Sequence, residues 1–226
     1  MPLAALAATL ALVVLAGCDR LAALAATHAQ QSFEARCEGL PAGRIDVVRL
    51  PITVTRDDSK PYDELARLSE PSAANHRTVG LTRGSFGYRS TLELEGLEDP
   101  RGPRACARPQ MRVQIEVSSL TVYVAREYRG DPCREPLILA HERKHVAVFE
   151  RYADEATPLL AREIDARIGR GVRYGATIVG VQEALKTDLS ASLDAFMERA
   201  RDEIARRHAR IDTRDEYERI TRNCGG

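Results

Sequence analysis

The hydrophobic pattern of this chain changes its period once, near Glu135, and that change limits the folds open to it. Before Glu135, apolar and polar residues alternate over several stretches, which is typical of half-buried β-strands. After Glu135, apolar residues recur every three or four positions, as on one face of an α-helix. The sequence therefore predicts an α+β fold in which a β-rich N-terminal half packs on an all-helical C-terminal half.

The alternating stretches before Glu135 are residues 48–54, 86–94 and 111–127. Pro51 has no N–H to donate, so we expect the first strand at an edge of the sheet. In the third stretch the parity of the apolar positions changes at Ser118-Ser119, which leaves two alternatives, a tight hairpin or one long strand with a β-bulge. A Ser-Ser pair suits a hairpin turn poorly, which favours the bulge. Elsewhere we expect a tether at residues 30–44, a short helix at 60–69 capped by Ser59, and a loop at 95–110.

Three or four helices are expected in the C-terminal half. The first carries an apolar stripe that includes two histidines, and Thr157-Pro158 favours a kink or a new helix there, because Pro suits a first helical position. A long helix should run from about Val179 to Arg210, and a short one should begin at Asp212 or Thr213. The stripe of the first helix consists of Leu137, His141, His145, Val148, Phe149 and Tyr152.

The N-terminal segment differs from the rest of the chain. Residues 2–17 carry no charge, and this run is too short for a comfortable membrane span but fits the apolar core of a signal peptide. It ends at Leu15-Ala16-Gly17-Cys18, which resembles a bacterial lipobox and implies that Cys18 is lipidated and becomes the mature N-terminus. Cleavage after Ala29 is a second option. We expect residues 1–29 to be a lipoprotein signal peptide and tether, and residues 30–226 to form one domain.

Charge and cysteine usage narrow the classes of partner. Lys+Arg and Asp+Glu both number 33, so the chain lacks the positive charge that would attract nucleic acid, and we expect no nucleic-acid partner. Without a lipidated Cys18, four of the five cysteines remain. An even number in an exported protein suggests two disulfides, and the absence of a CxxC pair argues against a structural zinc cluster.

His141-Glu142-Arg143-Lys144-His145 is an HExxH sequence on the first expected helix. Residues four apart lie on one helix face, so both imidazoles can bind one Zn²⁺ ion. Glu142 would lie beside the metal-bound water and take its proton, while zinc lowers the pKa of that water. The alternative is a histidine pair that only packs and hydrogen-bonds in the core. The motif favours His141 and His145 as zinc ligands and Glu142 as the general base.

From Cys106 to the C-terminus the order of features resembles the zincin metallopeptidases. These features are a cysteine, a long β stretch, a second cysteine, a short spacer, HExxH and a helical tail. More narrowly, the order resembles a bacterial family described as predicted secreted zinc-dependent proteases. The resemblance implies a zinc metallopeptidase of the cell envelope, with protein or peptide substrates. It also implies that residues 121–127, the strand before the motif helix, lie along the substrate by strand addition.

The third zinc ligand is left open between two glutamates. In that family a His-Gly pair near the C-terminus is a plausible third ligand, and residues 211–217 contain no such pair. Glu163 follows His145 by eighteen residues, on what we expect to be the next helix, which is similar to the gluzincin arrangement. Glu216 is the alternative by its position near the C-terminus. His208 falls on the apolar stripe of the long helix, and we expect it to be a core histidine.

The expected disulfides are Cys106–Cys133 and Cys37–Cys224. The first pair brackets the third strand stretch almost symmetrically about Ser119, so a hairpin would bring the two cysteines together. If that stretch is one bulged strand, the resemblance alone supports the pair. The second pair then follows by elimination among three connectivities.

Two functions from different classes follow from these features. The complete set of His141, Glu142 and His145 favours a zinc metallopeptidase anchored to a membrane through Cys18. The alternative is a catalytically inactive zinc-binding or protein-binding envelope lipoprotein.

Replacing Cys18 with Ser should release the protein from the membrane fraction or block its processing, because the acceptor of the lipid is removed. Cell fractionation and mass spectrometry of the mature N-terminus measure this. A mature N-terminus at Gln30 would instead show cleavage after Ala29.

Overall fold

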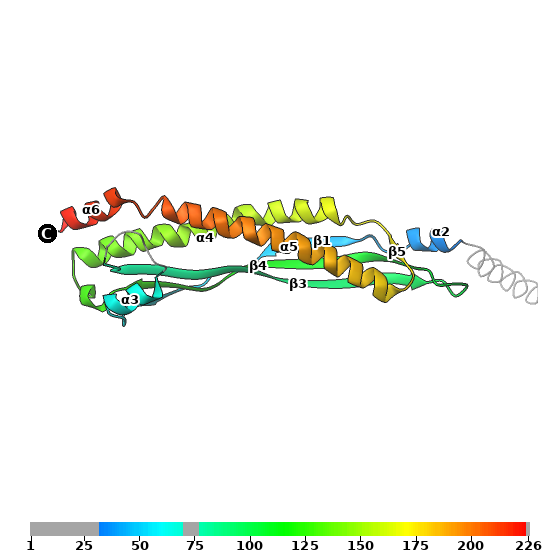
Figure 1. Ribbon diagram of the computed structural model, residues 1–226, viewed down its shortest axis with the longest axis horizontal. Coiled ribbons are helices and arrows are strands. Elements are labelled where there is room, and N and C mark those ends of the chain that lie inside the picture. The colour runs from blue at the N-terminus through cyan, green and yellow to red at the C-terminus, as the bar shows by residue number, and fades with distance from the viewer. Residues whose placement is uncertain (1–31, 70–76, 225–226) are drawn as a thin grey trace, which may run out of the picture.

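The computed structural model describes residues 32–69 and 77–224 of the chain. The expected signal peptide, Cys18 and both cleavage positions lie outside the described residues. The described part is a mixed α+β fold, in which one elongated mixed sheet is covered on one face by two long helices (Figure 1).

The central strand of the sheet is β4 (Ala105–Val124). The long strand β3 (Gly80–Glu98) pairs with it in antiparallel fashion from end to end. Because β3 occupies one edge of β4, the three short strands share the other edge. These are β5 (Arg173–Gly175), β1 (Arg44–Arg49) and β2 (Val54–Asp57), which pair with successive parts of β4.

Pro51 interrupts the edge strand between β1 and β2. Arg49 pairs with Ile115 and Val54 with Leu120, so both strands keep the same offset to β4 across the gap. The gap has a simple cause, since Pro51 has no N–H with which to continue the ladder. The edge position expected from Pro51 is confirmed.

A bulge at Ser119 makes β4 one continuous strand, which confirms the favoured alternative. Ser119 has a φ of 54°, and the pairing with β3 shifts between Arg83 and Ser85. Up to Val117 the odd-numbered positions are buried, and from Leu120 the even-numbered ones are. The extra residue therefore keeps the apolar side chains on one face although their parity changes.

The expectation that residues 121–127 bind substrate by strand addition is wrong. Residues 121–123 pair with both β2 and β3, so their backbone has no free edge. A 3-10 helix, η1 (Arg126–Tyr128), follows the strand.

Two segments are more regular than expected, and a third, the short helix expected at 60–69, is present with a different cap. Most of the expected loop at 95–110 belongs to β3 and β4, which are joined by a turn over residues 99–104. The expected tether contains helix α2 (Phe33–Glu38). Helix α3 (Tyr62–Leu68) has Pro61 at its N-cap, while the Ser59 hydroxyl donates to Asp57 instead of capping the helix.

The C-terminal half consists of helices α4 (Arg134–Arg167), α5 (Ile178–Ala209) and α6 (Arg214–Asn223). It is not all helical, because β5 lies between α4 and α5 and pairs with the start of β4. No new helix begins at Thr157-Pro158, since α4 continues through Pro158, so that alternative is wrong. The Thr157 hydroxyl donates to the Ala153 carbonyl at 2.8 Å. Residues of α4 are buried in the core both before Pro158, as at Ala156, and after it, as at Leu160.

The core lies between the sheet and the facing stripes of α4 and α5. Burial of these apolar side chains is the main source of stability for such a two-layer fold. Its largest fully buried members include Ile115, Leu120, Leu160, Ile164, Leu185 and Leu193.

Two disulfides are present, as expected, but their pairing was predicted wrongly. The structure joins Cys37 to Cys106 and Cys133 to Cys224, with Cα–Cα distances of 6.0 and 5.7 Å. Because β4 is a single strand, Cys106 and Cys133 lie at opposite ends of about 60 Å of extended chain. Two disulfides are typical of proteins in an oxidising compartment. Among the described residues, no helix has the length and apolar character to cross a membrane.

The bulge makes a testable prediction about stability. Ser119→Val should lower the free energy of unfolding by about 1–3 kcal/mol, because a β-branched residue is strained at a positive φ. Ser119→Gly should be close to neutral, since glycine accepts that conformation. Denaturant unfolding measures both, with Ser118→Val on the same exposed stretch as the control. Equal effects of the two valine substitutions would contradict a strained backbone at Ser119.

Candidate metal centre

Helix α4 places the two motif histidines side by side. His141 and His145 are one turn apart, and only 4% and 7% of their surfaces are exposed. Their Nε2 atoms lie 3.2 Å from each other. Two ring nitrogens at this distance repel unless a proton or a cation lies between them, because each neutral Nε2 without hydrogen presents a lone pair.

The end of α5 brings a carboxylate to the same point. The Asp212 N–H donates to the His208 carbonyl at 3.2 Å, which places Asp212 in one further turn after the last residues of α5. Asp212 Oδ1 lies 3.1 Å from the Nε2 atoms of both His141 and His145. Three ligand atoms from two separate elements therefore converge.

The three atoms fit the geometry of a zinc ion. Zinc bonds of about 2.0–2.1 Å at tetrahedral angles place neighbouring ligand atoms about 3.3 Å apart. The three observed separations are 3.1, 3.1 and 3.2 Å. Two imidazoles and one carboxylate also match the kind of donor set found in catalytic zinc sites, which leaves a fourth position for water or substrate.

The outer nitrogens of both histidines face partners that favour this arrangement. His141 Nδ1 lies 3.4 Å from Glu216 Oε1, and His145 Nδ1 lies 2.8 Å from His208 Nδ1. Burial and the neighbouring His145 lower the pKa of His208 to about 4, so His208 is neutral at pH 7 and can accept a hydrogen bond. If each Nδ1 carries the proton, both Nε2 lone pairs point to the centre.

Electrostatics keep the two acidic groups ionised. Partial removal from water alone would raise the pKa of Asp212, but in the alternative tautomer, in which Nε2 carries the proton, hydrogen bonds from His141 and His145 hold it well below its usual range. Tyr217 also donates to Asp212 Oδ1 at 2.9 Å. Hydrogen bonds from Arg219 and Lys144 hold the pKa of Glu216 well below its usual range. The centre therefore offers a carboxylate ligand and a carboxylate neighbour, both negatively charged at neutral pH.

Water reaches the centre from one side. The side chain of Asp212 is 37% exposed, whereas those of His141 and His145 are 5% and 9% exposed. The histidines thus form the closed wall of the site and Asp212 forms its open rim.

Glu142 points from α4 toward the sheet and is not among the three convergent residues. Its Oε2 accepts a hydrogen bond from the Thr82 hydroxyl on β3 at 2.7 Å, and burial raises its pKa. Gly80 makes room for it, because a Cβ at that position would overlap Glu142 Oε1 and Ile138 Cγ2. Glu142 is thus a buried, oriented carboxyl group beside the histidines.

The two glutamates expected as third ligands lie in different places. Glu163 pairs with Arg199 at 2.5 Å, and because α4 is continuous it lies about 27 Å along the helix axis from His145. Glu216 is close, but it faces the outer nitrogen of His141. The structure therefore brings Glu216 to the site and leaves Glu163 outside it.

Asp212 is the site residue that the sequence analysis missed. A signal was present, because Asp212 follows His208 by four residues, the same spacing that joins His141 to His145. His208 itself was expected to be a core histidine. It is only partly buried, and it contacts the rings of His145 and Phe149.

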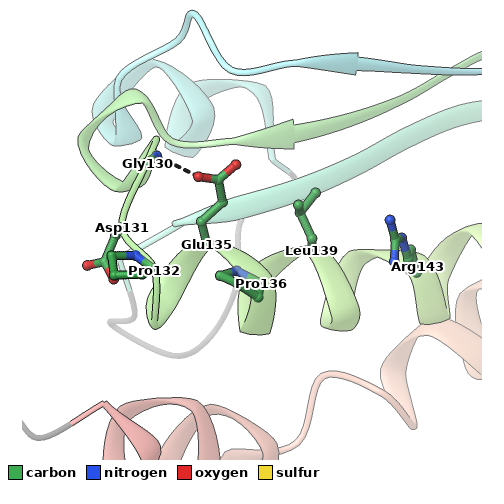
Figure 2. A pocket seen from close by; sticks show the side chains of 7 residues that line it. All are labelled: Gly130, Asp131, Pro132, Glu135, Pro136, Leu139 and Arg143. Carbon is green, nitrogen blue, oxygen red and sulfur yellow. Dashed lines mark hydrogen bonds between the residues drawn. The ribbon is translucent and has the colours of Figure 1, made fainter.

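A pocket on another flank of α4 does not include the metal centre. Figure 2 shows Glu135, Leu139 and Arg143 on successive turns of α4 beside this pocket, with the Gly130 N–H donating to Glu135. Arg143 is rotated by about 200° around the helix from His145, which places the two side chains on different flanks. The remaining lining residues are Asp131, Pro132 and Pro136.

Comparison with known proteins yields no relative. No protein-family model, curated protein or solved structure matches the chain. The chemistry of the site is therefore argued from its own residues.

The contact between His145 and His208 can be tested by zinc affinity. His208→Phe should weaken zinc binding about 10–100-fold, because the ring still packs on Phe149 but no longer accepts the His145 Nδ1 proton. His208→Asn keeps an acceptor and should retain most of the affinity. Competition with a chelator measures both, with Glu163→Ala as the unaffected control. Equal losses in the Phe and Asn variants would argue against this hydrogen bond.

Proposed function

We propose that this protein is a zinc-dependent metallopeptidase of the bacterial cell envelope. One Zn²⁺ ion per chain would be held by His141, His145 and Asp212. The observation that carries the proposal is the convergence of three ligand atoms within 3.2 Å of one another, next to the buried carboxyl group of Glu142. Asp212 takes the role that the sequence left open between Glu163 and Glu216.

Each residue around the site has a chemical role in this proposal. Zinc, when bound, would lower the pKa of a water molecule and polarise the peptide carbonyl. Glu142 is the general base that accepts the proton of the attacking water and later delivers it to the leaving amine. Its raised pKa brings it closer to neutral pH, where a group can both accept and release a proton. The Thr82 hydroxyl holds the Glu142 carboxylate in one orientation.

The substrate would be a protein or peptide in extended conformation. Within the described residues, the edge of β3 that faces away from β4 pairs with no other strand. β3 also supplies Thr82, which contacts Glu142. An extended chain added at this edge would therefore lie close to the general base and be recognised through its backbone. Export and a lipid anchor at Cys18 complete the proposal, and two disulfides suit an oxidising compartment.

A zinc-binding protein without hydrolytic activity is the second candidate. It is favoured by the burial of Glu142, which is 4% exposed and already hydrogen-bonded to Thr82. In that case Glu142 would only join α4 to β3.

Substitution of the motif residues separates the two candidates. Glu142→Gln should keep zinc and lose about 10²–10⁴-fold in hydrolysis, because an amide cannot accept the proton of water. His141→Ala should lose the metal, since two protein ligands rarely hold zinc tightly, and Asp212→Ala should weaken its binding. Glu163→Ala is the matched control and should change neither property.

Zinc content by metal analysis and cleavage of unfolded casein are the two measurements. Full zinc occupancy in His141→Ala would show that the motif does not hold the metal. Zinc in the wild type with no cleavage of casein or of a mixed peptide library would favour the binding protein.

A further inference from the structure

The Cys133–Cys224 disulfide joins the two elements that carry the metal centre. Cys133 immediately precedes α4, eight residues before His141, and Cys224 immediately follows α6, eight residues after Glu216. Asp212 lies just before α6, so this helix begins at the ligand and ends at the disulfide. The disulfide therefore ties the end of α6 covalently to the start of α4, next to the side-chain contacts between these two helices.

The disulfide and a small number of side-chain contacts hold α6 against α4. Its residues with described side chains are at most partly buried, and none belongs to the core between sheet and helices. Figure 1 shows α6 at one end of the molecule, beside the first turns of α4. The contacts across this interface include the pairs of Glu216 with Lys144 and with His141, and the rings of His141 and Tyr217, whose centroids lie 5.6 Å apart. No described side chain of α6 belongs to the core between the sheet and the helices, so the disulfide is the covalent constraint on this helix.

The two disulfides differ in access to solvent. Cys37 and Cys106 are completely buried, in a small cluster with Phe33 at the far end of the molecule. Cys133 and Cys224 are partly exposed. A thiol reductant must reach a sulfur atom to attack it, so the Cys133–Cys224 bond should be reduced first.

We propose that the Cys133–Cys224 disulfide is a redox latch that keeps Asp212 and Glu216 against the histidines of α4. This inference rests on the proposed zinc site and adds its regulation. A dithiol attacks one sulfur as its thiolate, and the Cys133–Cys224 bond breaks as a mixed disulfide forms. The second thiol of the reductant resolves that intermediate. The protein gains two electrons and two protons as two thiols, and the dithiol is oxidised to its cyclic disulfide.

Reduction loosens the metal centre from its open side. The far end of α6 becomes free, and the contacts of Glu216 and Tyr217 with His141 and Asp212 lose their covalent support. His141 and His145 stay fixed on α4, which packs in the core. The expected result is weaker zinc binding in an otherwise folded protein, reversed on reoxidation.

Matched double variants test the latch. The full-length protein with Cys133→Ser and Cys224→Ser should bind zinc at least about 10-fold more weakly than the oxidised wild type, as expected when a group that orients a ligand is lost. The variant with Cys37→Ser and Cys106→Ser removes the distant disulfide and should keep the affinity. Chelator competition with Zn²⁺ measures affinity, and backbone hydrogen exchange across α6 provides a second readout. Exchange in α6 should be faster only in the first variant.

Brief dithiol treatment of the wild type covers the case in which a variant fails to fold. Peptide mapping identifies the reduced pair, and affinity is measured on protein reduced at Cys133 and Cys224 alone. Unchanged zinc affinity and unchanged exchange in α6 would overturn the latch while leaving the zinc site intact. Absence of zinc binding by the oxidised wild type would overturn the proposed function and the latch together.

Discussion

The continuous apolar face of β4 is the constraint on which the rest of the structure depends. In the part of the chain that the structure describes, the other four strands all pair with β4, and both long helices pack on it. That face continues across Ser119 only because a bulged residue at positive φ corrects the parity of the buried positions. Without this correction, the apolar residues after Leu120 would face solvent, and α4 would lose the surface beneath its first turns.

The candidate metal centre follows from the way two long helices share that face. α4 supplies two histidines from its buried face, where packing fixes their rings. The turn after α5 supplies Asp212 at the surface. One part of the site is therefore rigid and closed, and the other is exposed and held by polar contacts. Such a division suits a centre that needs fixed ligands together with access for substrate.

The polar surroundings of the histidines support a metal site better than a packed histidine pair. In a core pair, each ring nitrogen would find a separate partner. Here both Nε2 atoms and one carboxylate oxygen face a single point, while the two Nδ1 atoms have partners of their own. This arrangement is the physical basis for proposing zinc, and the buried Glu142 beside it is the basis for proposing hydrolysis.

The sequence by itself determined the features that depend on neighbouring residues. Periodicity predicted parts of the two long strands, the bulge and the helical stripes, but neither β5 nor the gap between β1 and β2 within the strand expected at 48–54. A spacing of four residues placed His141 and His145 on one face. Only the tertiary structure decided which distant residues meet. Asp212 lies 67 residues after His145, and Cys133 lies 91 residues before Cys224. Local propensity does not predict such contacts, because they depend on the unbroken length of α4 and β4 and on how their ends align.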